Sequence, residues 1–248
     1  MKKTIKLTAL SIGCAAFAAF GFAFAQTNVA KAEMASAISS FEVVDGASIR
    51  KSAPEGIRFT ARIDKDQRAD GQTFGMLVMP TAIIDGALTL DTPNVLDIPA
   101  TQWVDEDAYE ANKFDVAYDY YTAVVAGEGD VFPEAYYNVP WTARAYVNDG
   151  TTVHYTDAVS VRSIAYVAKM AQMAGEGDID GTIAKIAQNA TVELSQSEIS
   201  LTCGETASLA LFVGNVVAES NENAKISVAY SSDKEAVASV DERGGKNA

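Results

Sequence analysis

The sequence predicts a mainly β fold in which a helix closes a β-rich domain of the α+β, sandwich-like type. Residues 56–63 alternate strictly between apolar and polar side chains, which is the period of a half-buried strand. Asn148-Asp149-Gly150 is typical of a β-hairpin turn. After this hairpin the spacing of apolar residues changes to that of an amphipathic helix.

The first 25 or so residues have the parts of a cleavable signal peptide. Lys2, Lys3 and Lys6 precede an apolar stretch over 7–24, which ends in the small-x-small exit Ala23-Phe24-Ala25. A retained membrane anchor is the alternative, because the stretch is nearly long enough to span a bilayer. Its alanine and glycine content favours cleavage. We therefore expect a secreted or cell-surface protein that meets the membrane only through export or an anchor outside this chain.

The balance of charge limits the partners of the chain. Loss of the signal-peptide lysines takes the formal net charge from −14 to −17, because residues 1–25 contain no acid. Such a surface repels nucleic-acid phosphates, so no nucleic-acid partner is expected. Nine acidic residues lie between 105 and 134 with a single basic one, Lys113. Solvated loops are the favoured interpretation of this cluster, with a Ca²⁺ site or a cationic partner as the alternative.

A flexible lead-in is expected over 26–37, followed by a first domain over 38–189. Its strands are predicted at 56–63, 74–79, 118–125, 141–147 and 151–155. Val161, Ile164, Ala165 and Ala168 have helical spacing, and the helix is expected to end at Gly175. A short helical run over 181–188 follows. Arg50, Arg58, Arg62 and Arg144 are expected to form salt bridges across neighbouring strands.

A second domain is predicted over 191–248, with strands at 192–194, 199–203, 207–213 and 226–230. Two segments carry a resemblance: residues 194–209, with Ile199-Ser200-Leu201-Thr202-Cys203-Gly204, and Tyr230-Ser231-Ser232-Asp233 followed by Val237-Ala238-Ser239-Val240-Asp241. Together they resemble the opening and the middle motif of a bacterial immunoglobulin-like group 2 domain. The resemblance covers about 191–244 and implies an Ig-like β-sandwich that serves as a spacer or adhesion module.

The resemblance also implies that this second domain is incomplete. The family's last two strands would follow the glycine-rich turn after Asp241, whereas this chain ends at Ala248. A sandwich without its closing strands exposes an open edge and a core face, so we expect a truncated product or fragment. Cys203 stands where the family usually has valine, which implies a buried, unreactive thiol. The first domain, through residues 45–60 and 142–146, resembles an uncharacterised module of exported proteins of gut Gram-positive bacteria.

No catalytic residue is assigned. His154 is the only histidine and falls in a predicted strand, and no Gly-x-Ser-x-Gly motif accompanies it, so a serine–histidine triad is not expected. Ser48-Ile49-Arg50-Lys51 matches the Ser-x-x-Lys motif of penicillin-interacting enzymes, but the companion motifs are missing. Acidic residues are plentiful, yet no motif singles out a pair for glycoside hydrolysis.

One candidate metal site lies between the two predicted helices. Glu176, Asp178 and Asp180 alternate like the ligands in the first half of an EF-hand loop, and Gly181 fits the turn. Ala187 stands where a bidentate glutamate would complete the Ca²⁺ shell. An acidic turn is therefore the favoured interpretation, and Ca²⁺ is the one cofactor candidate.

Aromatic residues of the later strands are the candidates for ligand contacts. Aromatic faces stack on the C–H surfaces of sugars, although at strand positions they more often fill a core. Core packing is favoured, with Tyr118, Tyr120, Trp141 and Tyr146 as candidate contacts to a glycan. We expect a non-enzymatic, modular protein of the cell surface or secreted fraction that binds a glycan or a surface protein. The alternative is the N-terminal fragment of an extracellular glycan-acting enzyme with accessory modules.

Overall fold

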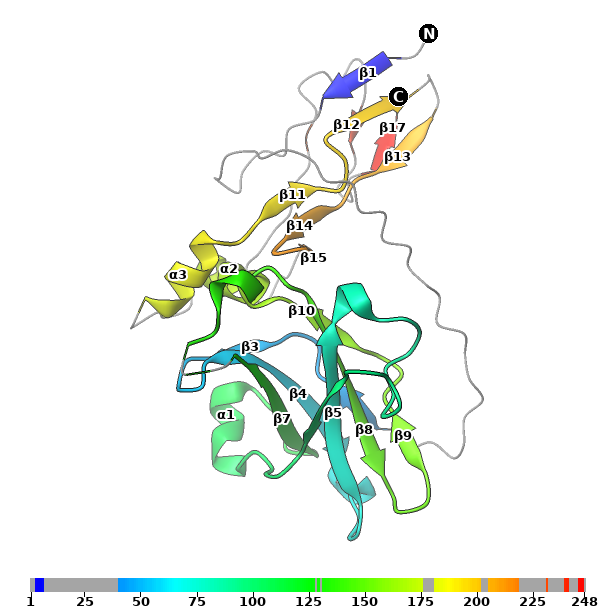
Figure 1. Ribbon diagram of the computed structural model, residues 1–248, viewed down its shortest axis with the longest axis vertical. Helices are drawn as coiled ribbons and strands as arrows, with labels where there is room; N and C mark the ends of the chain where they lie inside the picture. The colour runs from blue at the N-terminus through cyan, green and yellow to red at the C-terminus, as the bar shows by residue number, and fades with distance from the viewer. Residues whose placement is uncertain are drawn as a thin grey trace. The chain divides into compact units, whose positions relative to one another are not determined.

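The structure is a computed structural model, and it describes residues 3–6, 40–127, 129, 131–175, 181–201, 205–218, 231, 239–240 and 245–247 (Figure 1). It contains several antiparallel sheets and three short helices in this described part, so the predicted mainly β class is confirmed. The chain divides into two compact units: Thr27–Val167, named the sandwich unit here, and Met1–Gln26 together with Ala168–Ala248. Because the division falls inside a helix, the predicted domain limits stay predictions.

The first sheet of the sandwich unit is built on β4 (Gly56–Asp64). Along one edge, β4 pairs over its whole length with β7 (Tyr118–Ala126). Its other edge is shared by β2 (Phe41–Val43) and β3 (Ser48–Arg50). The predicted strands at 56–63 and 118–125 are therefore confirmed. They are hydrogen-bonded neighbours, although the partners Ile63 and Asp119 are 56 residues apart in sequence.

The second sheet has β5 (Thr73–Pro80) and β8 (Trp141–Asn148) at its centre. The short edge strand β6 (Leu96–Pro99) pairs with β5. Two further short strands, β9 (Val153–Tyr155) and β10 (Ser160–Arg162), share the far edge of β8. All of these pairings are antiparallel.

The core of the sandwich unit lies between the two sheets, which face each other (Figure 1). Strand β4 contributes Ile57, Phe59, Ala61 and Ile63, all fully buried, and this is the apolar face that the alternation predicts. The hydroxyl of Tyr121 on β7 crosses to the other sheet and donates to the carbonyl of Gly75 on β5 at 2.9 Å. Burial raises the pKa of this hydroxyl well above its ordinary value, so it stays a donor.

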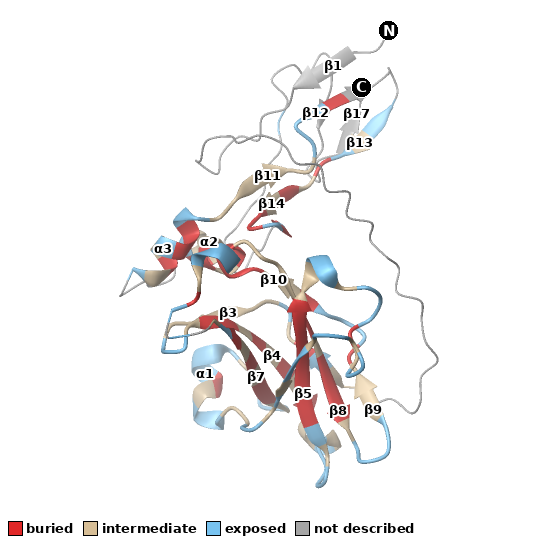
Figure 2. Ribbon diagram, in the orientation of Figure 1, coloured by how far each residue is buried: buried red, intermediate tan, exposed pale blue. Residues whose placement is uncertain are grey.

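Strand β5 is buried on both faces, which explains its continuous apolar sequence (Figure 2). Its outer face carries Leu77 and Met79, which pack with Leu88 and with Tyr146 of β8. The segment after the 3₁₀ turn η2 (Thr81–Ile83) supplies the cover, including Ile84 and Val95. Neither this cover nor β6 has a clear apolar period in the sequence.

The helix in which the two units divide begins later than its apolar spacing predicts. Val161 lies in β10, paired with Thr142, and α2 starts at Ile164 and ends at Ala174 (Ile164–Ala174). Val161 fits both the strand period and the helix period, and its pairing with the edge of β8 places it in a strand. Gly175 follows with φ +72°, in agreement with the predicted left-handed cap. The predicted run over 181–188 is the helix α3 (Thr182–Gln188).

The described strands of the other unit are short and antiparallel. A three-stranded sheet has the order β11 (Val192–Leu194), β14 (Leu211–Val213), β15 (Val216–Val217). In a second sheet, β17 (Gly245–Asn247) lies between β13 (Thr206–Ser208) and β16 (Ser239–Val240). The strand predicted at 207–213 is thus two strands with different partners. The predicted strand at 226–230 lies outside the described residues.

Within the predicted signal peptide the structure describes only β1 (Lys3–Lys6), which pairs with β12 (Glu198–Leu201). Signal cleavage and export stay predictions. In the part of the chain that is described, no helix is long and apolar enough to cross a membrane.

The predicted hairpin after β8 is confirmed, and its turn contains a titratable pair. One carboxylate oxygen of Asp149 accepts the backbone N–H groups of Thr151 and Thr152, and the other lies 2.9 Å from His154 Nε2. These bonds, that from His154 foremost, lower the pKa of Asp149 from 3.8 to about 2. The folded state thus holds this carboxylate ionised where the unfolded chain would protonate it.

This pair predicts an acid-dependent contribution to stability. A depressed folded-state pKa stabilises the fold above pH 3.8, and the contribution is lost as the pH falls toward 2. We expect His154→Asn to raise the pKa of Asp149, measured by NMR titration of its carboxyl carbon, and to reduce the acid dependence of the urea midpoint. Asp149→Asn is the control and should remove that dependence at this site. An unchanged Asp149 titration in His154→Asn would contradict the assigned pair.

Candidate functional site

A partly open pocket of about 250 Å³ lies on the outer face of the first sheet. All of its lining residues belong to the sandwich unit. Its floor is formed by Arg58 and Thr60 of β4 and Thr122 of β7. These residues alternate with buried core residues along their strands, so their side chains point away from the core. Thr60 and Thr122 are direct partners across the two strands. The floor therefore presents two neighbouring hydroxyls and a guanidinium group.

The first wall of the pocket is the connection between β2 and β3, residues 44–48. Three contacts fix this loop at points well separated in sequence. The backbone N–H of Val44 donates to the carbonyl of Thr60 at 2.9 Å, and the Ser160 hydroxyl donates to the carbonyl of Gly46 at 2.9 Å. Arg162 of β10 forms a 2.7 Å ion pair with Asp45. The wall is thus held in place by hydrogen bonds and an ion pair to neighbouring strands.

The second wall is supplied by Val104, Asn112 and Phe114, from the segment that contains the 3₁₀ turn η3 (Glu106–Ala108) and the helix α1 (Tyr109–Asn112). In Figure 1, α1 lies on the side of β7 that faces away from β5. Phe114 stacks on Tyr120 of β7 with ring centroids 4.0 Å apart and an interplanar angle of 5°. The Val104 N–H also donates to the Tyr120 carbonyl at 2.7 Å. Tyr120 therefore positions this wall from below.

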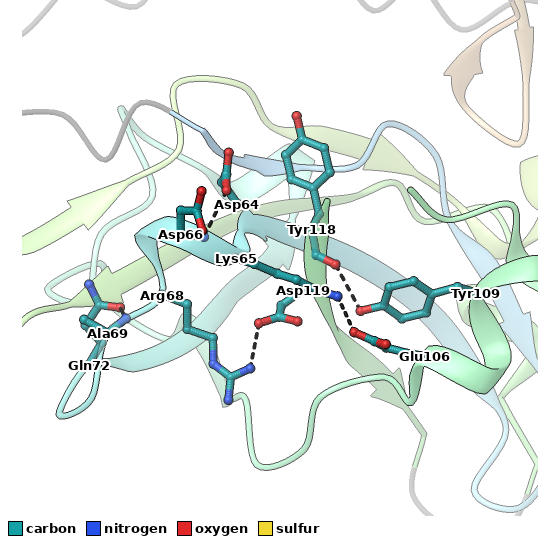
Figure 3. Close-up of polar contacts among 10 residues, drawn as sticks. All are labelled: Asp64, Lys65, Asp66, Arg68, Ala69, Gln72, Glu106, Tyr109, Tyr118 and Asp119. Atoms are coloured by element: carbon teal, nitrogen blue, oxygen red, sulfur yellow. Dashed lines mark hydrogen bonds and ion pairs between the residues drawn. The ribbon is translucent and has the colours of Figure 1, made fainter. Parts of the chain in front are cut away.

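Polar contacts at the end of the first sheet fasten the same segment (Figure 3). The Tyr109 hydroxyl donates to the carbonyl of Tyr118 at 3.1 Å, and Lys65 is ion-paired with Glu106. This bond to Glu106 raises the pKa of Lys65. Arg68 is paired with Asp119 at 2.6 Å and lies over the Trp103 ring. Two members of the acidic cluster at 105–134 are thus engaged with basic residues of the sandwich unit.

Arg58 differs from the other described arginines in its surroundings. Arg62 is paired with Glu42, its cross-strand partner, as the expected salt bridges predict. Arg50 and Arg144 bind backbone carbonyls instead. Half-buried Arg58 donates from Nε to the Ser48 hydroxyl at 2.9 Å, and within the described residues its terminal nitrogens have no carboxylate, carbonyl or ring as partner. The expected salt bridge is therefore absent at Arg58, and its guanidinium end is available to the pocket.

The four predicted aromatic contacts do not form one platform. Tyr118 and Tyr120 lie on the first sheet, whereas Trp141 and Tyr146 lie on β8 of the second. Tyr120 is 2% exposed and Tyr146 is 7% exposed, so little of either ring is open to a ligand. Burial is the main cause, and the hydrogen bond to Asp97 the second, of a rise in the pKa of Tyr146 to about 12.

The other two aromatic candidates are half-buried, and their ligand role stays a prediction. Tyr118 lies under the Arg62 guanidinium, 4.2 Å from its ring centroid. The indole N–H of Trp141 is buried and has no hydrogen-bond partner among the described residues. Neither side chain lines the pocket.

The metal and catalytic candidates add nothing to the described site. Glu176, Asp178 and Asp180 lie outside the described residues, so Ca²⁺ binding there stays a prediction. Over the described ranges, no group of three or more metal-ligating side chains is found. Ser48 lies in the strand β3, where the Ser-x-x-Lys motif requires the start of a helix.

Comparison with known proteins gives no family for this chain. A scan against protein-family models found no match, and a search of curated proteins found none either. The immunoglobulin-like resemblance of the second domain accordingly rests on its sequence motifs alone.

The pocket residues Arg58, Thr60 and Thr122 were not singled out as a site by the sequence. The alternation in β4 does place Arg58 and Thr60 on the polar face, which is the one available signal. The walls depend on contacts such as that between Asp45 and Arg162, 117 positions apart, which no local pattern predicts.

Proposed function

We propose that this chain is an exported, non-enzymatic, modular protein whose sandwich unit binds a small glycan in the pocket over β4 and β7. The pocket itself carries the proposal. It combines hydroxyl, amide and guanidinium groups with the apolar side chains of Val44, Val104 and Phe114. Sugars present the same mixture, hydroxyls around the ring edge and C–H groups on its faces.

The size and anchoring of the pocket support a small, rigid ligand. Pockets for drug-sized ligands enclose about 300–1,000 Å³, so a volume of about 250 Å³ suits a single sugar residue or chain end. Both walls are fixed by hydrogen bonds and ion pairs to the strands. A preformed site loses less conformational entropy on binding, which favours affinity for a small ligand.

The same pocket gives little support to the enzymatic alternative. Glycoside hydrolysis generally requires two carboxyl groups flanking the scissile bond. The described lining holds one carboxylate, Asp45, and Arg162 already neutralises it at 2.7 Å. A binding module fits this chemistry better than a hydrolase.

Export and modularity rest on the sequence. The charged and apolar segments of residues 1–25 support delivery across the membrane, and the Ig-like motifs after residue 191 support a spacer or adhesion role. The net charge of −14 suits a soluble surface module with no affinity for nucleic acid.

A glycan array probed with the full chain tests the proposal. We expect retention on at least one class among plant, host and peptidoglycan glycans. Thr122→Phe fills the floor of the pocket and should reduce this binding at least tenfold, because a ligand that cannot enter loses most of its buried contacts.

Thr73→Phe is the matched control, since Thr73 is an exposed threonine of a strand in the other sheet. It should bind like the unmodified chain. Amide NMR spectra establish that both variants are folded. Silence across the array, or equal binding by Thr122→Phe, would contradict a glycan site in this pocket.

A further inference from the structure

The guanidinium of Arg58 has one edge occupied and the other open. Ser48 accepts from Nε at 2.9 Å and fixes the orientation of the group. This leaves the two terminal nitrogens, which together form the donor fork that a carboxylate accepts through two parallel hydrogen bonds. Within the described residues no group of the protein occupies this fork.

Although the chain has a formal charge of −14, Arg58 lines the pocket without an acidic partner among the described residues. The described arginines nearby are all engaged: Arg62 with Glu42 and Arg162 with Asp45. A buried or half-buried cation is stabilised by an opposite charge, and the ligand is the group left to supply it.

We propose that the pocket recognises an acidic sugar, with the sugar carboxylate bound end-on by Arg58. This inference rests on the glycan-binding function proposed above and names the class of ligand. It assigns Arg58 as the residue that distinguishes a hexuronic acid from its neutral counterpart.

The arrangement of the floor fits such a ligand beyond its charge. Arg58 and Thr60 are two positions apart on β4 and share a face, which separates them by about 7 Å along the strand. A pyranose ring bridges this length, so its carboxylate can meet Arg58 while ring hydroxyls meet Thr60 and Thr122. The apolar side chains of Phe114 and Val104 then cover one face of the ring.

The charges facing the pocket do not cancel Arg58. Asp45 is the one carboxylate in the described lining, its side chain is 81% exposed, and it is paired with Arg162. Glu42, on the neighbouring strand, is paired with Arg62. More distant acids are screened by salt, whose Debye length is about 8 Å at physiological ionic strength.

The test is an amide NMR titration of the full chain with three probes: D-glucuronate, its methyl ester and D-glucose. The ester keeps the ring and removes the negative charge, and it adds one methyl group. We expect glucuronate to shift resonances of β4, β7 and the 44–48 loop, with an affinity at least tenfold above that of the ester, as a charge-assisted bidentate pair provides. Arg58→Gln should lose this preference, and Arg58→Lys should retain only part of it because lysine lacks the fork.

Arg50→Gln is the matched control, an arginine on the adjacent strand β3 that does not line the pocket, and it should keep the full preference. Equal binding of glucuronate and its ester would overturn the acidic-sugar inference and leave the glycan-binding function standing. An unchanged preference in Arg58→Gln would also overturn it. Pocket shifts with none of the three sugars would overturn both the inference and the proposed function.

Discussion

Replacing Gly56 with alanine is expected to lower the free energy of unfolding by about 3 kcal/mol, at the upper end of the cost of overpacking. A Cβ atom at this position would lie 2.2 Å from the carbonyl oxygen of Val125 and 3.1 Å from the Cα of Ala126. Both are backbone atoms of β7, the strand that pairs with β4 along its whole length. No side-chain rotation can relieve the contact, so one of the two strands must move.

Urea denaturation of the full chain, followed by tryptophan fluorescence, measures this loss. Gly71→Ala is the control: its Cβ would meet no atom within 4 Å, although φ is +85°. Only the left-handed backbone is strained there, at a cost of about 1–2 kcal/mol. If Gly56→Ala were no more destabilising than Gly71→Ala, the close approach of β4 and β7 would not be the reason for glycine at position 56.

Gly56 illustrates which features of the fold the sequence predicts and which it does not. The alternation after Gly56 predicts β4 and its buried face, because one side of the strand packs on a core and the other does not. The close backbone of β7 opposite Gly56 comes from a strand more than 60 positions away. Local periodicity carries no information on such a partner.

The sequence pattern does not predict the shortest elements, for a related reason. Strand β6 has four residues and ends in proline, and α1 also has four, so neither spans enough residues to display a period. Both are held by neighbours instead: β6 by pairing with β5, and the α1 segment by the Tyr109 and Phe114 contacts with β7. Tertiary contacts decide these elements, and the propensity of the residues contributes little.

The sequence likewise predicts part of the candidate site and leaves out the part that depends on tertiary contacts. The polar face of β4, with Arg58 and Thr60, is implied by the alternation, but a polar face alone is an ordinary solvent-exposed surface. It becomes a pocket only through two loops, 44–48 and 104–114, that the rest of the sandwich unit holds over it. The aromatic residues cluster in sequence, yet Tyr120 and Tyr146 are buried in packing contacts.

Gly75→Ala is the second substitution expected to have a large effect, a loss of about 2 kcal/mol in the free energy of unfolding. Gly75 is the cross-strand partner of Tyr146, whose ring lies over it. A Cβ atom would lie 2.5 Å from the Cζ of that ring. Unlike Val125 opposite Gly56, a tyrosine ring can rotate, but it would then leave Leu77 and Met79 and lose its 2.9 Å hydrogen bond to Asp97.

This mechanism requires the effects of Gly75→Ala and Tyr146→Leu to be non-additive. Leucine at position 146 removes the ring and with it most of the clash at residue 75. The double variant should therefore be more stable, by about 1 kcal/mol or more, than the sum of the two single-substitution effects predicts. Urea midpoints of the four proteins measure this coupling. Strict additivity would mean that the tyrosine ring is not what excludes a side chain at Gly75.

Tyr146 packs on the face of the second sheet, whereas the pocket lies on the first. Tyr146→Leu should therefore leave glycan binding unchanged, which separates the structural role of Tyr146 from a contact with ligand.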